Sequence, residues 1–460
     1  MTAPARVLVV SPEPVGRAMA GPAIRAWELA RALAERFTVT LAAPPASEPP
    51  DPAGAPSGLE LLEADVREFH ALARACERHD VVVAQRLPAQ LLRHCGRSPA
   101  RLVVDLYNPL VVEVLEAAAG ETPARARRTG RIVTAGVRAH LAAADFVLCA
   151  SERQRDLWVG AMALHGLLDP ALYRADPTLR GLIDVVPFGI PDGPPPAASR
   201  EGRWPAVGRG DRVLLWGGGI WRWLDALTPI RAMERIRRER DDVHLVFLGT
   251  GRPLEARGAS VAAEAATEAR RLGLLGERVH VEDGWVPYAE RGPLLAAADI
   301  GVSAHHDHLE SRYAFRTRLT DYMWAGLPVV TSSGDALGEL VARRGLGAAV
   351  APGDVEGFAA ACLALLADEG RYERAAAASA AAGRELRWSE VTRPLQRFCL
   401  DPERRRAPVR GSLARESLGQ QAWIAVDLLA RLGSREVGRR ARWAAGRTVR
   451  RLASRGRRPT

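Results

Sequence analysis

The residues best suited to bind a charged ligand lie together in one stretch of the second half of the chain. A strand-like run ends at Ser303, and the polar segment after it contains Glu310, Arg316 and Arg318. Asp321 follows, inside the first turns of a helix predicted over residues 318–325. A carboxylate at a helix start would mainly offset the helix dipole. The deeper position of Asp321 predicts that it faces a cleft and binds a ligand, with a plain surface acid as the alternative.

Two glycine-rich turns are candidate anion sites. Gly217, Gly218 and Gly219 follow a strand predicted over residues 213–216, and consecutive glycines allow backbone N–H groups to approach a phosphate closely. Gly21 lies between the first predicted strand and the first helix, where N-terminal amides attract anions. Ordinary tight turns explain both segments equally well, so the triple glycine counts only together with the nearby Arg222.

Histidines and cysteines do not predict a metal centre. His305, His306 and His308 crowd one short loop with Asp307, but no second set of ligands stands at zinc spacing. A polar cleft loop is therefore the favoured interpretation. The five cysteines show no CxxC or other ligand spacing, so buried thiols in a reducing, cytosolic setting are expected.

The basic residues exclude some reaction classes and mark the C-terminus. All 64 are arginine, which excludes a Schiff-base lysine and a Walker phosphate loop. Residues 401–460 hold 16 arginines against five acids, so their net charge is +11. The whole chain has a net charge of +10, so residues 1–400 are almost neutral. Nucleic-acid binding could therefore concern this segment at 401–460 alone, and it is disfavoured as a function of the protein. Its apolar stretch at 423–429 and the arginines that follow predict a basic amphipathic helix on an anionic membrane, with a solvated tail as the alternative.

The order of elements predicts an α/β fold. Apolar runs of strand length alternate with helical segments over residues 7–187 and again over 213–350, which is typical of parallel sheets covered on both faces. The predicted domains are 1–190 and 213–385, joined by a Pro/Gly-rich linker at 191–212. A crossover segment at 386–402 and the basic tail at 403–460 follow. Such domains bind ligands in the cleft between them, and no stretch reaches the length of a membrane span.

These motifs resemble those of the family 4 glycosyltransferases, which have the GT-B fold of two Rossmann-like domains. The resemblance covers about residues 6–400. Asp321 stands five residues before Gly326 of the run Gly-Leu-Pro-Val-Val, where the family has the second acid of its donor-domain signature. Phe315 matches the aromatic residue of that signature.

The chain departs from the family pattern at three places. Asp321 replaces the usual Glu. The first acid would fall at Tyr313, but the nearest carboxylate is Glu310, three residues earlier. Arg316-Thr-Arg318 stands where the family usually has Gly-Leu-Pro.

The resemblance implies roles in the second domain. Asp321 would bind the ribose hydroxyls of a nucleotide, since a carboxylate can accept from both hydroxyls of a diol, and Glu310 would meet the donor sugar. Arg222 falls on the lysine that binds the donor diphosphate, next to Gly218 and Gly219. The arginine that accompanies this lysine in the family is a glycine here. Arg316 or Arg318 is therefore predicted to supply the missing cation.

Three further residues take their predicted roles from the same resemblance. The loop of Gly21 would contact the donor phosphate and the acceptor. Asp105 ends a strand where the family often has an acid or a histidine that faces the sugar. Val286 lies in the segment Gly-Trp-Val-Pro, which resembles a base-binding loop.

The predicted activity is retaining transfer of a sugar from a nucleotide-diphosphate sugar to an acceptor hydroxyl, with Arg222, Glu310 and Asp105 as catalytic candidates. The leaving diphosphate would help to deprotonate the acceptor, and neither a metal nor a permanently bound cofactor is implied. By analogy, the acceptor is a glycan or lipid-linked precursor of a bacterial cell-surface polysaccharide or glycoconjugate. The enzyme would be cytoplasmic and peripheral on the inner face of the plasma membrane through residues 416–460.

Other functions remain open at this stage. A pseudo-glycosyltransferase or assembly subunit would bind the nucleotide sugar without transferring it. A sugar-nucleotide epimerase is less favoured. An NAD-dependent oxidoreductase is disfavoured because no GxGxxG follows the first strand.

Overall fold

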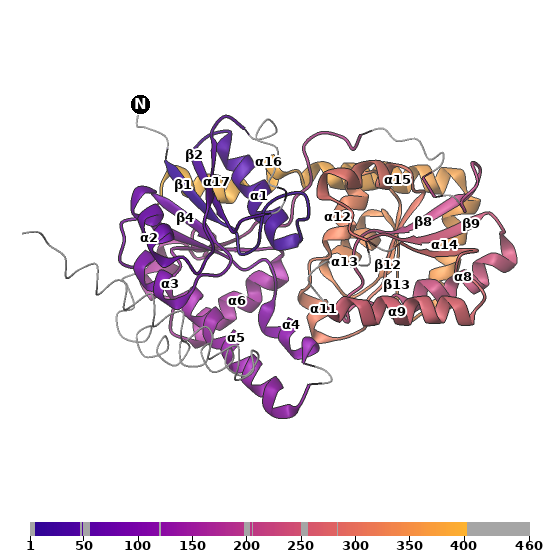
Figure 1. The fold of residues 1–460 in the computed structure, drawn as a ribbon, viewed down its shortest axis with the longest axis horizontal. Helices are drawn as coiled ribbons and strands as arrows, with labels where there is room; N and C mark the ends of the chain where they lie inside the picture. Colours follow the sequence, from indigo (N-terminus) through magenta and orange to yellow (C-terminus); the bar gives the residue numbers. More distant parts are fainter. Residues whose placement is uncertain are drawn as a thin grey trace, which may run out of the picture.

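The computed structural model describes residues 5–46, 48, 56–118, 121–196, 203–204, 206–249, 256–282 and 284–402. Within these ranges the chain forms two parallel β-sheets, each covered by helices, that lie side by side (Figure 1). The α/β fold of two doubly wound domains is therefore confirmed. The predicted basic tail lies outside the described residues.

The first domain contains a seven-stranded sheet in the order β3-β2-β1-β4-β5-β6-β7. Its strands are β1 (Arg6–Val10), β2 (Thr38–Ala43), β3 (Leu59–Glu63), β4 (Val81–Ala84), β5 (Arg101–Asp105), β6 (Phe146–Cys149) and β7 (Ile183–Val185). Its helices are α1 (Gly21–Ala34), α2 (Phe69–Arg78), α3 (Ala89–Cys95), α4 (Leu110–Ala117), α5 (Pro123–Ala143), α6 (Glu152–Leu164) and α7 (Pro170–Ala175). Valine-rich strands such as β4 are buried on both faces, which is what a parallel sheet between two helix layers requires.

The second domain contains a six-stranded sheet in the order β10-β9-β8-β11-β12-β13. Its strands are β8 (Arg212–Trp216), β9 (Val243–Phe247), β10 (Val279–Val281), β11 (Ile300–Ser303), β12 (Val329–Ser332) and β13 (Gly347–Val350). Its helices are α8 (Leu227–Glu239), α9 (Ala256–Arg271), the 3₁₀ helix η2 (Tyr288–Glu290), α10 (Arg291–Ala296), α11 (Leu309–Tyr313), α12 (Thr317–Trp324), α13 (Ala336–Arg344), α14 (Val355–Ala367) and α15 (Glu369–Glu385).

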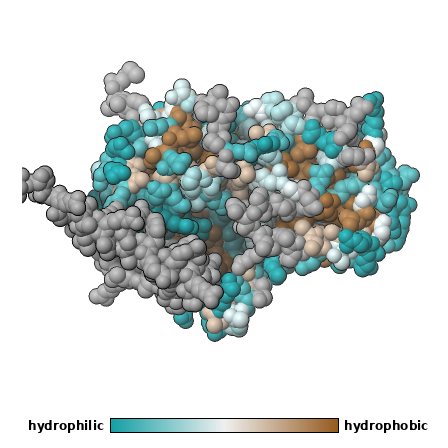
Figure 2. Space-filling model, viewed as in Figure 1, coloured by the Kyte–Doolittle hydropathy of each residue, from teal (hydrophilic) through white to brown (hydrophobic). Residues whose placement is uncertain are grey.

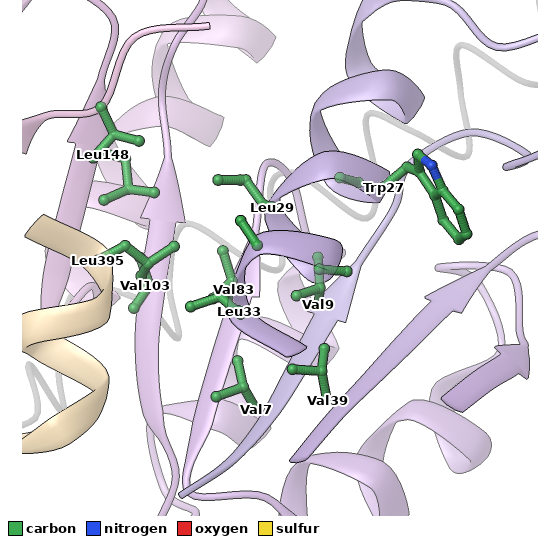
Figure 3. Close-up of a cluster of buried hydrophobic side chains, with 14 of the residues drawn as sticks. Val7, Val9, Trp27, Leu29, Leu33, Val39, Val83, Val103, Leu148 and Leu395 are labelled. Carbon is green, nitrogen blue, oxygen red and sulfur yellow. The ribbon is translucent and has the colours of Figure 1, made fainter. Parts of the chain in front are cut away.

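The end of the described chain returns to the first domain. Helices α16 (Trp388–Val391) and α17 (Arg393–Leu400) pack on its sheet, and Leu395 joins Val103 and Leu148 in the core shown in Figure 3. Phe398 stacks on Phe146 with ring centroids 4.9 Å apart. The chain thus passes between the domains twice. The apolar residues of α16 and α17 are buried in the core of the first domain, and this holds the end of the second crossing in place.

The two crossings are hydrogen-bonded to each other. The Ile190 N–H donates to the Leu386 carbonyl at 2.9 Å, and the Trp388 N–H donates to the Ile190 carbonyl at 3.0 Å. A Cβ on Gly189 would lie 2.5 Å from the Trp388 ring, so only glycine allows this approach. The crossings therefore form one hinge beside the cleft.

Both sheets reverse their strand order beside their first strand, at β1/β4 and at β8/β11. In doubly wound sheets, ligands bind in the crevice at the carboxyl ends of the strands at this point. The surface of both domains is mixed, with hydrophobic residues broken up by hydrophilic ones on the face shown in Figure 2. None of the helices in the described part of the chain is long and apolar enough to cross a membrane.

Candidate active site between the two domains

A cavity of about 230 Å³ lies where the switch points of the two sheets face each other. The first domain contributes the segment 19–21 and Phe188, and the second contributes residues 217–219 with loops that follow β9 and β10. Seven residues singled out from the sequence line it together: Gly21, Gly217, Gly218, Gly219, Val286, Arg318 and Asp321. Residues almost 300 positions apart in the chain therefore meet in one space.

The triple glycine is held in place by a tyrosine of helix α12. The Tyr322 hydroxyl donates to the Val302 carbonyl of β11 and accepts from the Gly217 N–H, both at 2.8 Å. Gly218 adopts a φ of 93°, a conformation that favours glycine. The loop after β8 thus has a fixed shape, with its backbone at the wall of the cavity.

Arg318 presents an unpaired donor on the wall of this cavity. One of its nitrogens donates to the Gly219 carbonyl at 2.8 Å, and the guanidinium lies 4.4 Å from the centre of the Trp216 ring. The other terminal nitrogen, Nη1, is buried and has no hydrogen-bond partner among the residues that the structure describes. Burial lowers the pKa of the guanidinium to about 10, so it stays charged at neutral pH. A buried cation with an N–H donor that is directed to no described residue is suited to bind an anion.

Asp321 is positioned by an arginine that the sequence did not single out. Arg291 donates from Nε to one carboxylate oxygen of Asp321 at 3.0 Å. The Arg291 guanidinium lies between two aromatic rings, 3.6 Å from the centre of Tyr288 and 4.9 Å from that of Trp324. One oxygen of Asp321 is thus engaged, and no hydrogen bond to the other is found among the described residues.

Glu310 and Arg316 form a buried ion pair. Arg316 donates from Nη1 and Nη2 to the two carboxylate oxygens of Glu310, at 3.1 and 2.7 Å. Both side chains are almost completely buried. Asp335 lies on the other side, with an oxygen 3.8 Å from Arg316 Nε. Arg316 is therefore occupied by acids, whereas Arg318 is not.

The histidine loop lies beside this ion pair. His305 Nε2 is 3.6 Å from Asp335, and burial lowers the pKa of the His305 imidazole. The His308 side chain accepts from the Ser311 N–H and caps α11. In the described part of the chain, no group of three or more His, Cys, Asp or Glu residues is arranged to hold a metal ion.

An acid of the first domain faces the ion pair from across the cleft. Glu113 on α4 is half-buried, and α4 packs against α11, which carries Glu310. Burial and the negative charge of Glu310 raise the pKa of the Glu113 carboxyl to about 7. No local pattern in the sequence points to Glu113, because only the packing of the two domains brings these acids together.

None of the three predicted catalytic residues lines this cavity. Glu310 is held in the buried ion pair with Arg316, which is also absent from the cavity wall. Arg222 is exposed and lines a separate cavity of about 170 Å³ with His306 and Glu264, although its neighbour Trp221 lines the main one. Asp105 is buried, and both of its oxygens accept from Arg25, at 2.6 and 2.8 Å. Arg25 also donates to two backbone carbonyls near residue 186. Asp105 is thus paired with a buried arginine and does not line the cavity.

The second domain matches a known family. Residues 211–368 match the model of the family described as "Glycosyl transferases group 1". No curated protein sequence matches the chain significantly.

Solved structures with the same fold cover nearly the whole described chain. Sucrose-phosphate synthase (tll1590) from Thermosynechococcus elongatus is 16% identical, and the match covers 86% of this chain and 98% of that chain with a TM-score of 0.59. Anabaena Alr3699/HepE, solved in complex with UDP-glucose, is 15% identical over 87% of this chain and 100% of that chain, with a TM-score of 0.60. WaaG, a glycosyltransferase involved in lipopolysaccharide biosynthesis, is 16% identical over 86% and 100%, with a TM-score of 0.57.

These comparisons define the class of the protein. The structural likenesses show the fold, which is that of GT-B glycosyltransferases. The family match in the second domain adds the activity, so the chain is a glycosyl-transfer enzyme of the GT-B type.

Proposed function

We propose that the protein is a retaining glycosyltransferase that moves a sugar from a nucleotide-diphosphate sugar to an acceptor hydroxyl. The observation that carries this proposal is the single cavity lined by Asp321, Arg318 and the glycine loop at 217–219. In our assignment Asp321 accepts from the ribose, and the glycine amides and Arg318 surround the diphosphate. HepE, which shares the fold, was solved with UDP-glucose, and this supports a nucleotide sugar as donor.

Arg318 is the better candidate for the missing cation. Both terminal nitrogens of Arg316 donate to Glu310. By contrast, Arg318 lines the cavity, and its Nη1 has no hydrogen-bond partner among the described residues. Arg222 remains the proposed second cation, since it follows Trp221 of the cavity wall in the same loop. Together they would stabilise the negative charge that develops on the departing diphosphate.

Retention is proposed to occur on one face of the sugar. A double displacement needs a carboxylate nucleophile, but both oxygens of Glu310 already accept from Arg316. In the proposed step, the bond from the anomeric carbon to the diphosphate oxygen breaks and the acceptor oxygen bonds to the same face. The acceptor proton passes to an oxygen of the departing diphosphate. Glu310 then contributes by its charge and position near the donor sugar.

The proposed acceptor is a glycan or lipid-linked hydroxyl compound of bacterial surface polysaccharide or glycoconjugate synthesis. We place the enzyme in the cytoplasm, peripheral on the inner face of the plasma membrane. The sequence of residues 416–460 supports this, because apolar residues are interleaved with arginines there. A chain that ends at Pro402 should lose binding to vesicles containing anionic lipid, and unchanged binding would contradict this placement.

A panel of nucleotide sugars tests the activity. Release of a nucleoside diphosphate from one donor, followed by NMR of the product, should show an anomeric configuration equal to that of the donor. Inversion would contradict the one-face step. Binding of a nucleotide sugar with no transfer to any acceptor would instead favour the alternative of a binding-only protein.

A further inference from the structure

The start of helix α6 in the first domain makes several direct contacts with the second domain. It begins with the pattern Ser151-x-x-Gln154, and the Ser151 hydroxyl accepts from the Gln154 N–H. The side-chain amide oxygen of Gln154, Oε1, in turn accepts from the Ala150 N–H at 2.8 Å. This arrangement resembles a capping box, with the side-chain bond shifted to the residue before the N-cap, and it fixes the orientation of the Gln154 amide because the amide oxygen is committed to the helix start.

The NH₂ group of Gln154 connects the two domains. It donates to the Tyr107 carbonyl of the first domain at 2.9 Å and to the Tyr313 carbonyl of the second at 2.8 Å. Tyr313 is the last residue of α11. Gln154 is completely buried, so all of its amide hydrogen bonds are made to protein groups in a site closed to solvent.

Arg153 contacts the second domain beside it. Its Nη1 donates to the Arg312 carbonyl at 3.2 Å and to the Gly334 carbonyl at 2.6 Å, and its Nη2 pairs with the Glu339 carboxylate. Arg312 lies in α11, and Gly334 lies in the loop between β12 and α13. Two consecutive residues of one helix turn thus bind the end of α11, which carries Glu310, and the loop after β12, which leads to Asp335.

These contacts act on a short helix that carries Glu310 and leads to Arg316. Glu310 lies in the first turn of α11, and Arg316 follows three residues after its end. A five-residue helix has little stability of its own. Its position relative to the first domain therefore depends on what it contacts there, which is α4 and the start of α6 (Figure 1).

We infer that Arg153 and Gln154 form an interdomain latch that holds the cleft closed and positions Glu310 and Arg316 for transfer. Both are positioning residues, since neither lines the cavity. The catalytic part of this inference rests on the proposed transferase function, whereas the latch itself does not.

Two variants and a matched control test the latch in turnover. Arg153→Ala removes three contacts with the second domain from a partly exposed position, and Gln154→Glu keeps the capping acceptor but removes both N–H donors. We expect kcat to fall about tenfold or more, while the KM of the donor changes less than about threefold and the melting temperature of Arg153→Ala stays unchanged. Arg155→Ala is the control, because among the described residues the hydrogen bonds of the Arg155 side chain are made to the Ile183 and Thr178 carbonyls of the first domain. Its kcat should equal that of the wild type.

A distance measurement without substrate separates the latch from the proposed activity. All five native cysteines are buried, so spin labels can be directed to Leu164→Cys in the first domain and Arg343→Cys in the second, both exposed positions. The doubly labelled protein should give a narrow distance distribution, and adding Arg153→Ala should broaden it toward longer distances. An unchanged distribution in both latch variants would overturn the inference. If Arg153→Ala broadens the distance distribution but the wild type transfers no sugar, the latch is supported and the proposed function is contradicted.

Discussion

The Arg318→Gln substitution tests the assignment of the donor cavity most directly. Arg318 is the cavity cation with a buried, unpartnered nitrogen, and its pKa of about 10 leaves it charged at neutral pH. Glutamine removes the charge and keeps the first part of the side chain with an N–H donor, two bonds shorter than that of arginine. The substitution therefore tests the charged donor at the cavity while it preserves most of the apolar stem.

The expected loss follows from the contact that the charge would make with a diphosphate. A charge-assisted hydrogen bond contributes roughly 1.5–3 kcal/mol, and two unit charges about 4 Å apart attract by about 4 kcal/mol at an effective dielectric constant of about 20. Taking about 3 kcal/mol, kcat/KM for the donor should fall about 100-fold. Folding should suffer little, because the variant also relieves the burial of a charge without a full set of partners. The melting temperature is therefore expected within about 2 °C of the wild type.

The assay is release of nucleoside diphosphate from the donor that supports turnover, with thermal unfolding measured on the same samples. Arg222→Gln is the matched control, since Arg222 is exposed and lines the neighbouring cavity. Its loss should be smaller, about tenfold or less. The reasoning is refuted if Arg318→Gln retains kcat/KM within about threefold of the wild type, or if Arg222→Gln is the more damaging of the two.

Three further predictions concern the buried acids. Because the Glu113 pKa is raised from 4.5 to about 7, the stability of the wild type should fall by up to about 3 kcal/mol as pH rises through this window. Urea unfolding at pH 5 and pH 8 should show that the stability of Glu113→Gln lacks this fall. If the variant and the wild type lose the same stability between the two pH values, the raised pKa of Glu113 is contradicted. Arg316→Met leaves Glu310 buried without its partner and should cost about 3–5 kcal/mol in the same measurement; wild-type stability would contradict the pairing. Asp105→Asn should destabilise by a similar amount by stranding Arg25, whereas a lower kcat at intact stability would support the sugar contact predicted from the sequence.

The sequence predicts the sheets well because buried parallel strands are continuous apolar runs. The runs at 7–10, 81–84 and 300–303 coincide with β1, β4 and β11 to within a residue. Strand β3, Leu-Glu-Leu-Leu-Glu, was not predicted, since it lies at the sheet edge and two of its residues are acids facing solvent. Helix α11 was also missed, because five polar-rich residues carry no helical period.

The candidate site is predicted in part for a similar reason. Asp321, Arg318 and the glycines follow strand ends, and topology alone brings such positions to one cleft. The ion-pair partners of the charged residues cannot be predicted in this way. Arg25 and Asp105 are 80 residues apart, and Arg291 reaches Asp321 over 30 residues. Nothing in local spacing reports such pairs, so a strand-end acid can be predicted while its partner, and with it the role of the acid, cannot.

The segment Phe-Arg-Thr-Arg shows how two departures from the family pattern compensate each other. Residues two apart on a helix point to different sides, and Arg316 and Arg318 flank the start of α12 in this way. Arg316 turns toward Glu310 and pairs with this acid in a site closed to water. Arg318 turns toward the Gly219 carbonyl and leaves a charged donor at the cavity. An uncompensated Glu310 would be costly to bury. Arg291, which also lines the cavity, already donates to Asp321, so the loss of Arg318 would remove the cation whose donor is directed to an anion. If Glu310 takes the place of the family's first acid, as we propose, Arg316 makes its shifted position tolerable while Arg318 supplies charge at the cavity, so the two changes would be expected to occur together.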